Sequence, residues 1–136
     1  MKYRFIEDLT SDVFFEAYGK DLKEVFENSA EAMFEIICKS KSIEEKQTIE
    51  VEVRGKDEKD LLYNWLQELI AQVDIEGIFF SRFNILEISK DHLKAELHGE
   101  PVSMEKGNTV VKAVTYYKFD LKRTEKGYTS TVSLDI

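Results

Sequence analysis

The 136-residue sequence contains one cysteine, one proline, two histidines and six glycines. A single cysteine cannot form an intramolecular disulfide, so nothing requires an oxidising compartment and we expect a cytoplasmic protein. No apolar stretch approaches the ~18 residues that cross a bilayer, and the first residues, MKYRFIEDL, lack the apolar core of a signal peptide. No linker rich in Gly, Ser or Pro divides the chain. We therefore predict a single domain over residues 1–136 that makes no contact with a membrane.

Positive charge is also in short supply. The 27 acidic residues outnumber the 19 basic ones, which gives a formal net charge of −8. Proteins that bind nucleic acids neutralise phosphates with clustered Lys and Arg, whereas the basic residues here are spread along the chain. The balance argues against strong direct nucleic-acid binding. It favours cations or basic protein surfaces as partners.

The motifs of common enzyme classes are absent. There is no nucleophile elbow, Walker loop or Gly-rich dinucleotide turn. His98 and Glu100 match half of the zinc deaminase signature, but the Pro-Cys-x-x-Cys half is missing. His92 and His98 leave Ser-His-Asp chemistry open by composition, although nothing else supports it. Cys38 ends an apolar helical face, which favours a buried structural thiol over a reactive one. We expect a protein without catalytic activity of its own.

Two segments have the periodicity of amphipathic helices, residues 19–39 and 56–74. Asp21 and Asp57 are predicted to cap their N-termini. Phe26, Met33 and Trp65 are expected in the core. The apolar residues at helical spacing are Leu22, Val25, Phe26, Ala30, Met33 and Ile37 in the first segment, and Leu62, Trp65, Leu66, Leu69 and Val73 in the second.

Most of the remaining sequence has the alternating pattern of strands. In QTIEVEVRG, for example, Ile49, Val51 and Val53 share one face. In the last strand the apolar side is expected to carry Val132 and Leu134. Two helices packed on a mostly antiparallel β-sheet give an α+β fold. The predicted strands cover residues 3–8, 12–18, 47–55, 78–89, 92–100, 110–124 and 127–136.

Carboxylates gather at three places in the sequence. Glu7, Asp8 and Asp12 lie around the first turn, Asp74 and Glu76 end the second helix, and Asp135 precedes Ile136. Calcium and magnesium require several oxygen ligands, which often combine carboxylates with backbone oxygens. Most acids of this kind face only water, so the residues leave open both a metal site and a solvated surface.

Several segments, read together, resemble the archease family over essentially the whole chain. They are LTSDVFFEAYGKDLKEVFENSAEAMF, LLYNWLQELI, DIEGIFFSRF, GEP, VKAVTYYKFDL and the final LDI. Their order and spacing follow the family pattern. The resemblance implies a non-catalytic partner that activates the RtcB-type tRNA-splicing RNA ligase. Such a partner promotes guanylylation of the ligase, which uses GTP and manganese, and supports multiple turnover in tRNA exon ligation.

The same resemblance implies a divalent-metal site. The family positions fall here on Asp12, Asp135 and Ile136, the last through its carboxylate or carbonyl. Calcium is the expected ion, and manganese could take its place when the protein acts with the ligase. Two positions depart from the family pattern, because Leu9 and Tyr117 stand where the family usually has His. Both departures remove an imidazole close to the implied site.

Three other interpretations stay open. The protein could be a chaperone-like modulator of another RNA-modifying enzyme such as a tRNA methyltransferase, a role also proposed for the family. It could be a metal-dependent hydrolase that uses Asp12 and Asp135, although no water-activating base is evident. It could also be a calcium-binding structural module, in which case Asp12→Ala would lower stability without affecting any partner.

Overall fold

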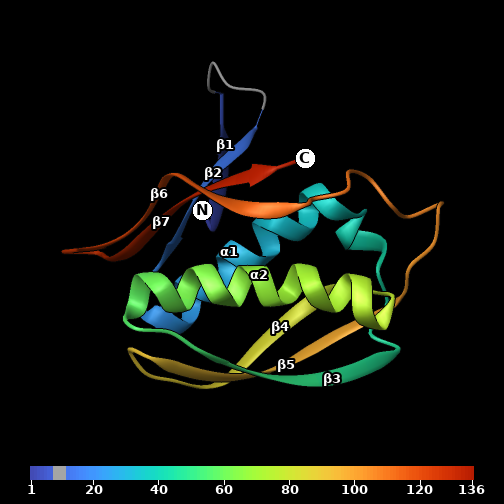
Figure 1. Ribbon diagram of the computed structural model, residues 1–136, viewed down its shortest axis with the longest axis horizontal. Helices are drawn as coiled ribbons and strands as arrows, with labels where there is room; N and C mark the ends of the chain where they lie inside the picture. Colours follow the sequence, from blue (N-terminus) through green and yellow to red (C-terminus); the bar gives the residue numbers. More distant parts are fainter. Residues whose placement is uncertain (8–11) are drawn as a thin grey trace.

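The computed structural model describes residues 1–7 and 12–136. Two α-helices lie between two antiparallel sheets, one above and one below them in Figure 1. The elements of the described chain are β1 (Tyr3–Ile6), β2 (Val13–Gly19), α1 (Leu22–Ile37), the 3-10 helix η1 (Ser40–Ser42), β3 (Gln47–Arg54), α2 (Glu58–Glu76), β4 (Ile78–Ile88), β5 (His92–Pro101), β6 (Ala113–Thr124) and β7 (Gly127–Asp135).

The strands divide into a four-stranded sheet of order β1-β2-β7-β6 and a three-stranded sheet of order β3-β5-β4. Every neighbouring pair is antiparallel. The α+β fold predicted from the sequence is confirmed. The division into two sheets was not predicted, because alternation within a strand shows which face is buried but not which strand lies beside it. Asp8 and Leu9 lie outside the described residues.

Both helices begin where the sequence predicts. The Asp21 side chain accepts a hydrogen bond from the backbone N–H of Glu24 at 2.9 Å, and Asp57 accepts one from Asp60 at 2.8 Å. The Asp60 carboxylate in turn accepts from the backbone N–H of Lys56 at 2.8 Å, which completes a reciprocal cap. The second helix runs two residues beyond Asp74 to Glu76, and Gly77 caps it with a φ of 64°, which suits glycine.

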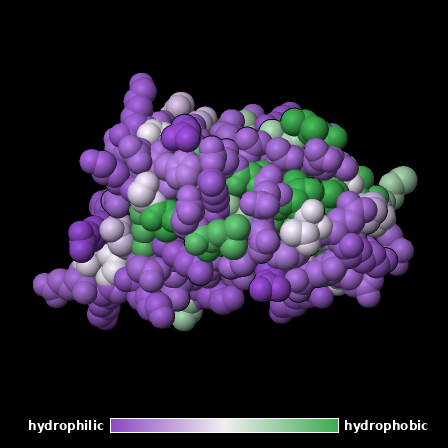
Figure 2. Space-filling model, turned by 90° about the horizontal axis from the view of Figure 1, so that it is seen from below, coloured by the Kyte–Doolittle hydropathy of each residue, from purple (hydrophilic) through white to green (hydrophobic). Residues whose placement is uncertain are grey.

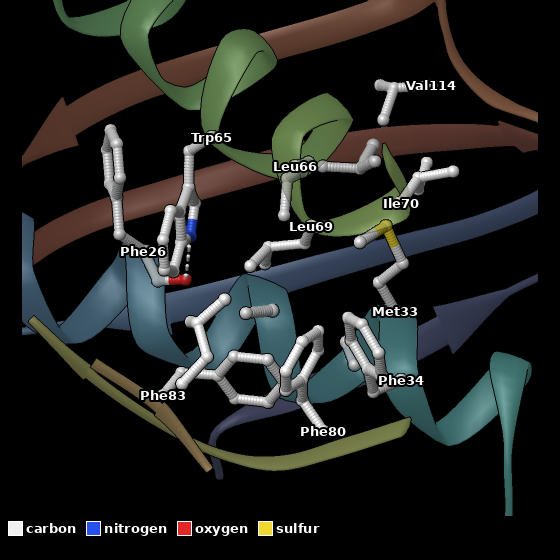
Figure 3. Close-up of a cluster of buried hydrophobic side chains, with 14 of the residues drawn as sticks. Phe26, Met33, Phe34, Trp65, Leu66, Leu69, Ile70, Phe80, Phe83 and Val114 are labelled. Carbon is white, nitrogen blue, oxygen red and sulfur yellow. Dashed lines mark hydrogen bonds between the residues drawn. The ribbon is translucent and has the colours of Figure 1, made fainter. Parts of the chain in front are cut away.

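The main core fills the space between the helices and the sheets. Phe26, Met33 and Trp65 are fully buried there, as predicted. The indole Nε1 of Trp65 donates a hydrogen bond to the backbone oxygen of Phe26 at 3.0 Å (Figure 3). A buried indole needs such a partner, because an unpaired N–H in the core is costly. Within the described chain, neither helix is long and apolar enough to cross a membrane.

The edge strand β4 is irregular. Its pairing with β5 shifts register between Phe80 and Arg82 and again between Ile85 and Glu87. At the second irregularity, the carboxylate of Glu27 on α1 accepts a hydrogen bond from the backbone N–H of Ile85 at 2.9 Å. A helix side chain therefore occupies a donor that a regular edge would offer to another strand.

Candidate metal-binding end of the four-stranded sheet

Asp12 and Asp135 meet at one end of the four-stranded sheet. Asp12 directly precedes β2, and Asp135 is the last residue of β7. The two strands are antiparallel, and their terminal pair is Val13 opposite Leu134. One residue further out on each strand are the two aspartates. The structure thus brings together two residues that are 123 positions apart in sequence, since 135 − 12 = 123.

Neighbouring residues hold both positions. The buried hydroxyl of Ser133 donates a hydrogen bond to Asp12 Oδ2 at 3.4 Å, and Asp12 itself is half-buried. The backbone N–H of Lys112 donates to the carbonyl of Asp135 at 2.8 Å, while the Asp135 side chain is exposed. Sequence analysis missed Ser133 and Lys112 as supporting residues. The one available signal was that Ser133 lies on the polar side of the β7 alternation.

The donor set fits a hard divalent cation. Asp12 and Asp135 supply carboxylate oxygens, and Ile136, 41% exposed, follows directly and can add a backbone oxygen. Calcium accepts this mixture of ligands and commonly completes its shell with water. The described residues contain no cluster of three or more His, Cys, Asp or Glu placed to hold a metal. The two carboxylates and one backbone oxygen are fewer than the six to eight oxygen ligands that calcium usually takes.

Tyr117 lies beside this end of the sheet. The pairing of β6 with β7 shifts register between Thr115 and Asp120, and Lys118 in this irregularity has a φ of 52°. The Tyr117 ring packs edge-on against Phe14, with centroids 6.0 Å apart. Phe14 is paired with Ser133, the residue that contacts Asp12. The Tyr117 ring therefore packs beside the strand residue that pairs with Ser133.

The remaining acids of the sequence analysis do not all gather here. Glu7 is exposed just after β1. Asp74, near the end of α2, lies instead at the wall of a small apolar cavity together with Ile37 and Val110. Carboxylates at separate places on the surface fit the solvated interpretation better than a shared ligand role.

The two histidines lie on β5, in the three-stranded sheet. His92 Nε2 lies 3.2 Å from a Glu52 carboxylate oxygen. His98 Nδ1 forms a 2.9 Å hydrogen bond with the Thr48 hydroxyl. Among the contacts found for the described residues, neither imidazole is hydrogen-bonded to a serine or cysteine. The hydroxyl that contacts His98 belongs to Thr48, which stands opposite it on the neighbouring strand β3.

Cys38 is buried, with 1% of its surface exposed, as predicted. Burial, aided by the nearby charge of Glu100, raises the pKa of its thiol to about 12. A thiol of this kind carries almost no thiolate near neutral pH.

A larger cavity of about 660 Å³ lies between β1, the end of α1 and η1. Several charged groups on its wall pair with each other. Lys2 Nζ lies 3.0 Å from a Glu31 oxygen, and the Tyr3 hydroxyl donates to Glu35 at 2.5 Å. Burial is the largest cause that raises the pKa of Tyr3, followed by the hydrogen bond to Glu35. Because Lys2 is paired with Glu31 and Tyr3 with Glu35, these side chains are less available to bind a charged ligand in the cavity.

Comparison with known proteins agrees with this fold. The Archease protein family matches residues 3–136. The archease of Archaeoglobus fulgidus is 39% identical over 140 residues, and the alignment covers 100% of both chains. The archease of Methanothermobacter thermautotrophicus is 38% identical over 133 residues, covering 95% of each. The solution structure of Methanobacterium thermoautotrophicum protein 1598 matches with a TM-score of 0.86 at 36% identity, covering 98% of each chain.

A crystal structure from Thermotoga maritima, described as an archease and possible chaperone, matches with a TM-score of 0.70. It covers 98% of this chain and 97% of that one at 19% identity, which shows a shared fold. The architecture is thus that of a small α+β protein whose paired acids end one of two antiparallel sheets. From the matches of sequence and fold, the chain belongs to the archease family.

Proposed function

We propose that this protein is a non-catalytic, cytoplasmic activator of an RtcB-type tRNA-splicing ligase. It promotes guanylylation of the ligase and multiple turnover in tRNA exon ligation. The observation that carries the proposal is the meeting of Asp12 and Asp135 at the paired ends of β2 and β7 in a chain of the archease family. In this proposal, the two acids are the part of the protein that works against the partner.

Asp12, Asp135 and a backbone oxygen of Ile136 would hold a divalent cation, calcium or, with the ligase, manganese. When bound, the cation would offset negative charge on phosphoryl oxygens during nucleotide transfer. The chain's own residues supply position and charge. Ser133 restrains the Asp12 carboxylate, and the β2–β7 pairing holds both acids at one sheet end.

The charge of the whole chain supports a protein partner of this kind. A net charge of −8 favours docking onto the basic surface of an RNA- and nucleotide-binding enzyme over direct contact with RNA. The partner would contain the RNA and nucleotide sites, and this protein would contribute Asp12 and Asp135.

The test is multiple-turnover ligation by a cognate RtcB-type ligase with GTP and manganese, with this protein substoichiometric. Asp12→Asn and Asp135→Asn remove one charge each while keeping side-chain size. Glu125→Gln is the matched control, because Glu125 is exposed in the β6–β7 turn, at the other end of β7. We expect wild type and the control to raise turnover and both Asp variants to lose at least about tenfold of the stimulation.

Unchanged stimulation by the folded Asp variants would remove the metal site from the mechanism. If wild type has no effect, the activator proposal fails. The alternative is then a chaperone-like modulator of another RNA-modifying enzyme such as a tRNA methyltransferase. The Thermotoga maritima protein is described as a possible chaperone, which supports considering the chaperone-like role second. Binding to the methyltransferase without an effect on ligation would support it.

A further inference from the structure

A small apolar cavity opens where the C-terminal ends of α1 and α2 approach the segment before β6. Its volume is about 140 Å³. An apolar cavity of roughly 150 Å³ accepts a benzene-sized group, so this one has room for a single aliphatic or aromatic side chain. We call it the α2-end groove, defined by its apolar lining of Ile37, Ile70, Val73, Phe79, Val110 and Val111.

Apolar side chains are also exposed around the α2-end groove. Val110, part of its lining, is 78% exposed, and Ile75, next to Asp74 on its wall, is 71% exposed. Val102 and Met104, from the segment that leads to Gly107 on the same wall, are 45% and 100% exposed. Figure 2 shows one face of the molecule as mainly hydrophilic with some apolar surface. Exposed apolar groups gathered around a cavity typically mark an interaction site.

The backbone around the groove is fixed by hydrogen bonds. The N–H of Val102 donates to Gly77 O at 2.9 Å, at the end of α2. The N–H groups of Asn108 and Thr109 donate to the carbonyls of Ile37 and Ile36, both at 3.0 Å, at the end of α1. The exposed apolar side chains therefore stand on an ordered support. Binding a partner there would cost little backbone ordering.

The surroundings of the groove are acidic. Asp74 lies on its wall, Glu76 ends α2, and the last turn of α2 carries no basic residue against the negative end of the helix dipole. Of the nearby lysines, Lys106 Nζ donates to Glu100 at 2.6 Å and Lys39 Nζ donates to the Glu105 carbonyl at 2.9 Å, while Lys112, directly after Val111, is exposed. A ligand of the groove should therefore combine an apolar side chain with positive charge.

We propose that the α2-end groove anchors a segment of the partner protein, an apolar side chain flanked by Lys or Arg. This inference rests on the proposed function and takes the ligase as the partner. Continuity with the candidate metal end supports it. Val111 lines the groove, and the next residue, Lys112, donates its backbone N–H to Asp135. One partner surface can thus cover the groove and the paired aspartates together. In this proposal the groove contributes binding affinity, and the aspartates act on nucleotide transfer.

The test is the Kd between this protein and the ligase, measured by calorimetry, for wild type, Val110→Asp and Leu86→Asp. Leu86 is the matched control, because it is a 51% exposed apolar residue on β4, outside the groove. Both substitutions place a carboxylate on the surface, and circular dichroism checks that both variants fold. We expect Val110→Asp to raise Kd by at least about tenfold and Leu86→Asp to leave it within about twofold. Asp74→Lys should also raise Kd, because it reverses a charge on the wall.

The outcomes separate this inference from the proposed function. If wild type stimulates ligation but Val110→Asp binds as tightly as Leu86→Asp, the groove inference is wrong and the activator proposal stands. If binding depends on Val110 but wild type does not raise turnover, the groove inference stands and the activator proposal is wrong. If wild type does not bind the ligase, both are wrong.

Discussion

Trp65 on α2 donates its indole N–H to the backbone oxygen of Phe26 on α1 at 3.0 Å, and both side chains are fully buried. This hydrogen bond joins the two helices directly. It also fixes how deep the indole lies between them, because the donor has a single direction. Apolar contacts alone would let α1 and α2 slide along each other. The hydrogen bond fixes their relative position.

Truncation of this tryptophan should be costly. Trp65→Ala is expected to lower the free energy of unfolding by roughly 3–5 kcal/mol, because it leaves a large cavity and removes the hydrogen bond. Trp65→Phe keeps a ring and is expected to lose less, mainly the hydrogen bond of roughly 1 kcal/mol and some packing. Urea denaturation followed by circular dichroism measures both. Equal losses in the two variants would show that filled volume is not the main contribution.

A buried pair of hydroxyls joins α1 to the four-stranded sheet. Ser29 donates to the Val25 carbonyl at 2.6 Å, and its oxygen lies 2.8 Å from the hydroxyl of Ser130 on β7. Both serines are 0% exposed. Ser29→Ala should cost roughly 1–3 kcal/mol, because it leaves the Ser130 hydroxyl without this partner. The double variant with Ser130→Ala should cost less than the sum of the single ones, by roughly 1 kcal/mol. Strict additivity in a double-mutant cycle would contradict a coupled pair.

An ion pair fixes the segment after β5. The Glu100 side chain is 9% exposed and accepts from Lys106 Nζ at 2.6 Å and from the backbone N–H of Glu44 at 2.9 Å. The hydrogen bond from Lys106 is the largest cause that lowers the pKa of Glu100 below its ordinary 4.5. Because the folded state favours the ionised form, this contribution to stability is complete above about pH 4.5. It is lost as the pH falls through the folded-state pKa.

Unfolding free energies measured from pH 7 to pH 3 test this dependence. The stability difference between wild type and Glu100→Gln should shrink as the pH falls below about 4.5. Lys106→Met should reduce the same dependence, because it removes the main cause of the lowered pKa. A difference that stays constant with pH would contradict the assignment.

The thiol of Cys38 should be inert in the native protein. With a pKa of about 12 and 1% exposure, it should react with a thiol-specific reagent such as DTNB at pH 8 only when the structure opens. We expect slow labelling without denaturant and fast labelling in concentrated urea. Moving the thiol to an exposed position, with Cys38→Ala and Ser103→Cys together, should give fast labelling under both conditions. Fast native labelling of wild type would show that Cys38 is accessible.

Much of the fold could be predicted from the sequence, because its signals are local. Asp21 and Asp57 mark helix starts through contacts three residues away, and the apolar spacing around Trp65 identifies the buried side of α2. The pairing of strands that are far apart in sequence, β2 with β7 and β3 with β5, is not local. The short predicted turn between the first two strands indicates that β1 and β2 are neighbours, but nothing in the pattern of β2 shows that its other neighbour is β7. For the same reason, the separation into two sheets appears only in three dimensions.

The candidate site was accessible to sequence analysis only in part. Asp12 and Asp135 were selected through the family resemblance, and the structure places them at paired strand ends. The same resemblance placed Tyr117 near them, whereas Ser133 could not be placed there. Ser133 acts through a cross-strand neighbour, and Tyr117 is redirected by an irregularity that contains a residue of positive φ, Lys118. Alternation rules fail at such irregularities, because one inserted residue exchanges the two faces.

The irregular edge of β4 affects how readily copies of the protein pair through their edge strands at high concentration. A straight edge strand can recruit the same strand of another copy and start an ordered aggregate. Here two shifts of register bend the strand, and Glu27 occupies the N–H of Ile85. Substituting Glu27 would leave that donor without this partner. The helix side chain therefore supports the sheet and also makes this edge a poorer template for pairing with another strand.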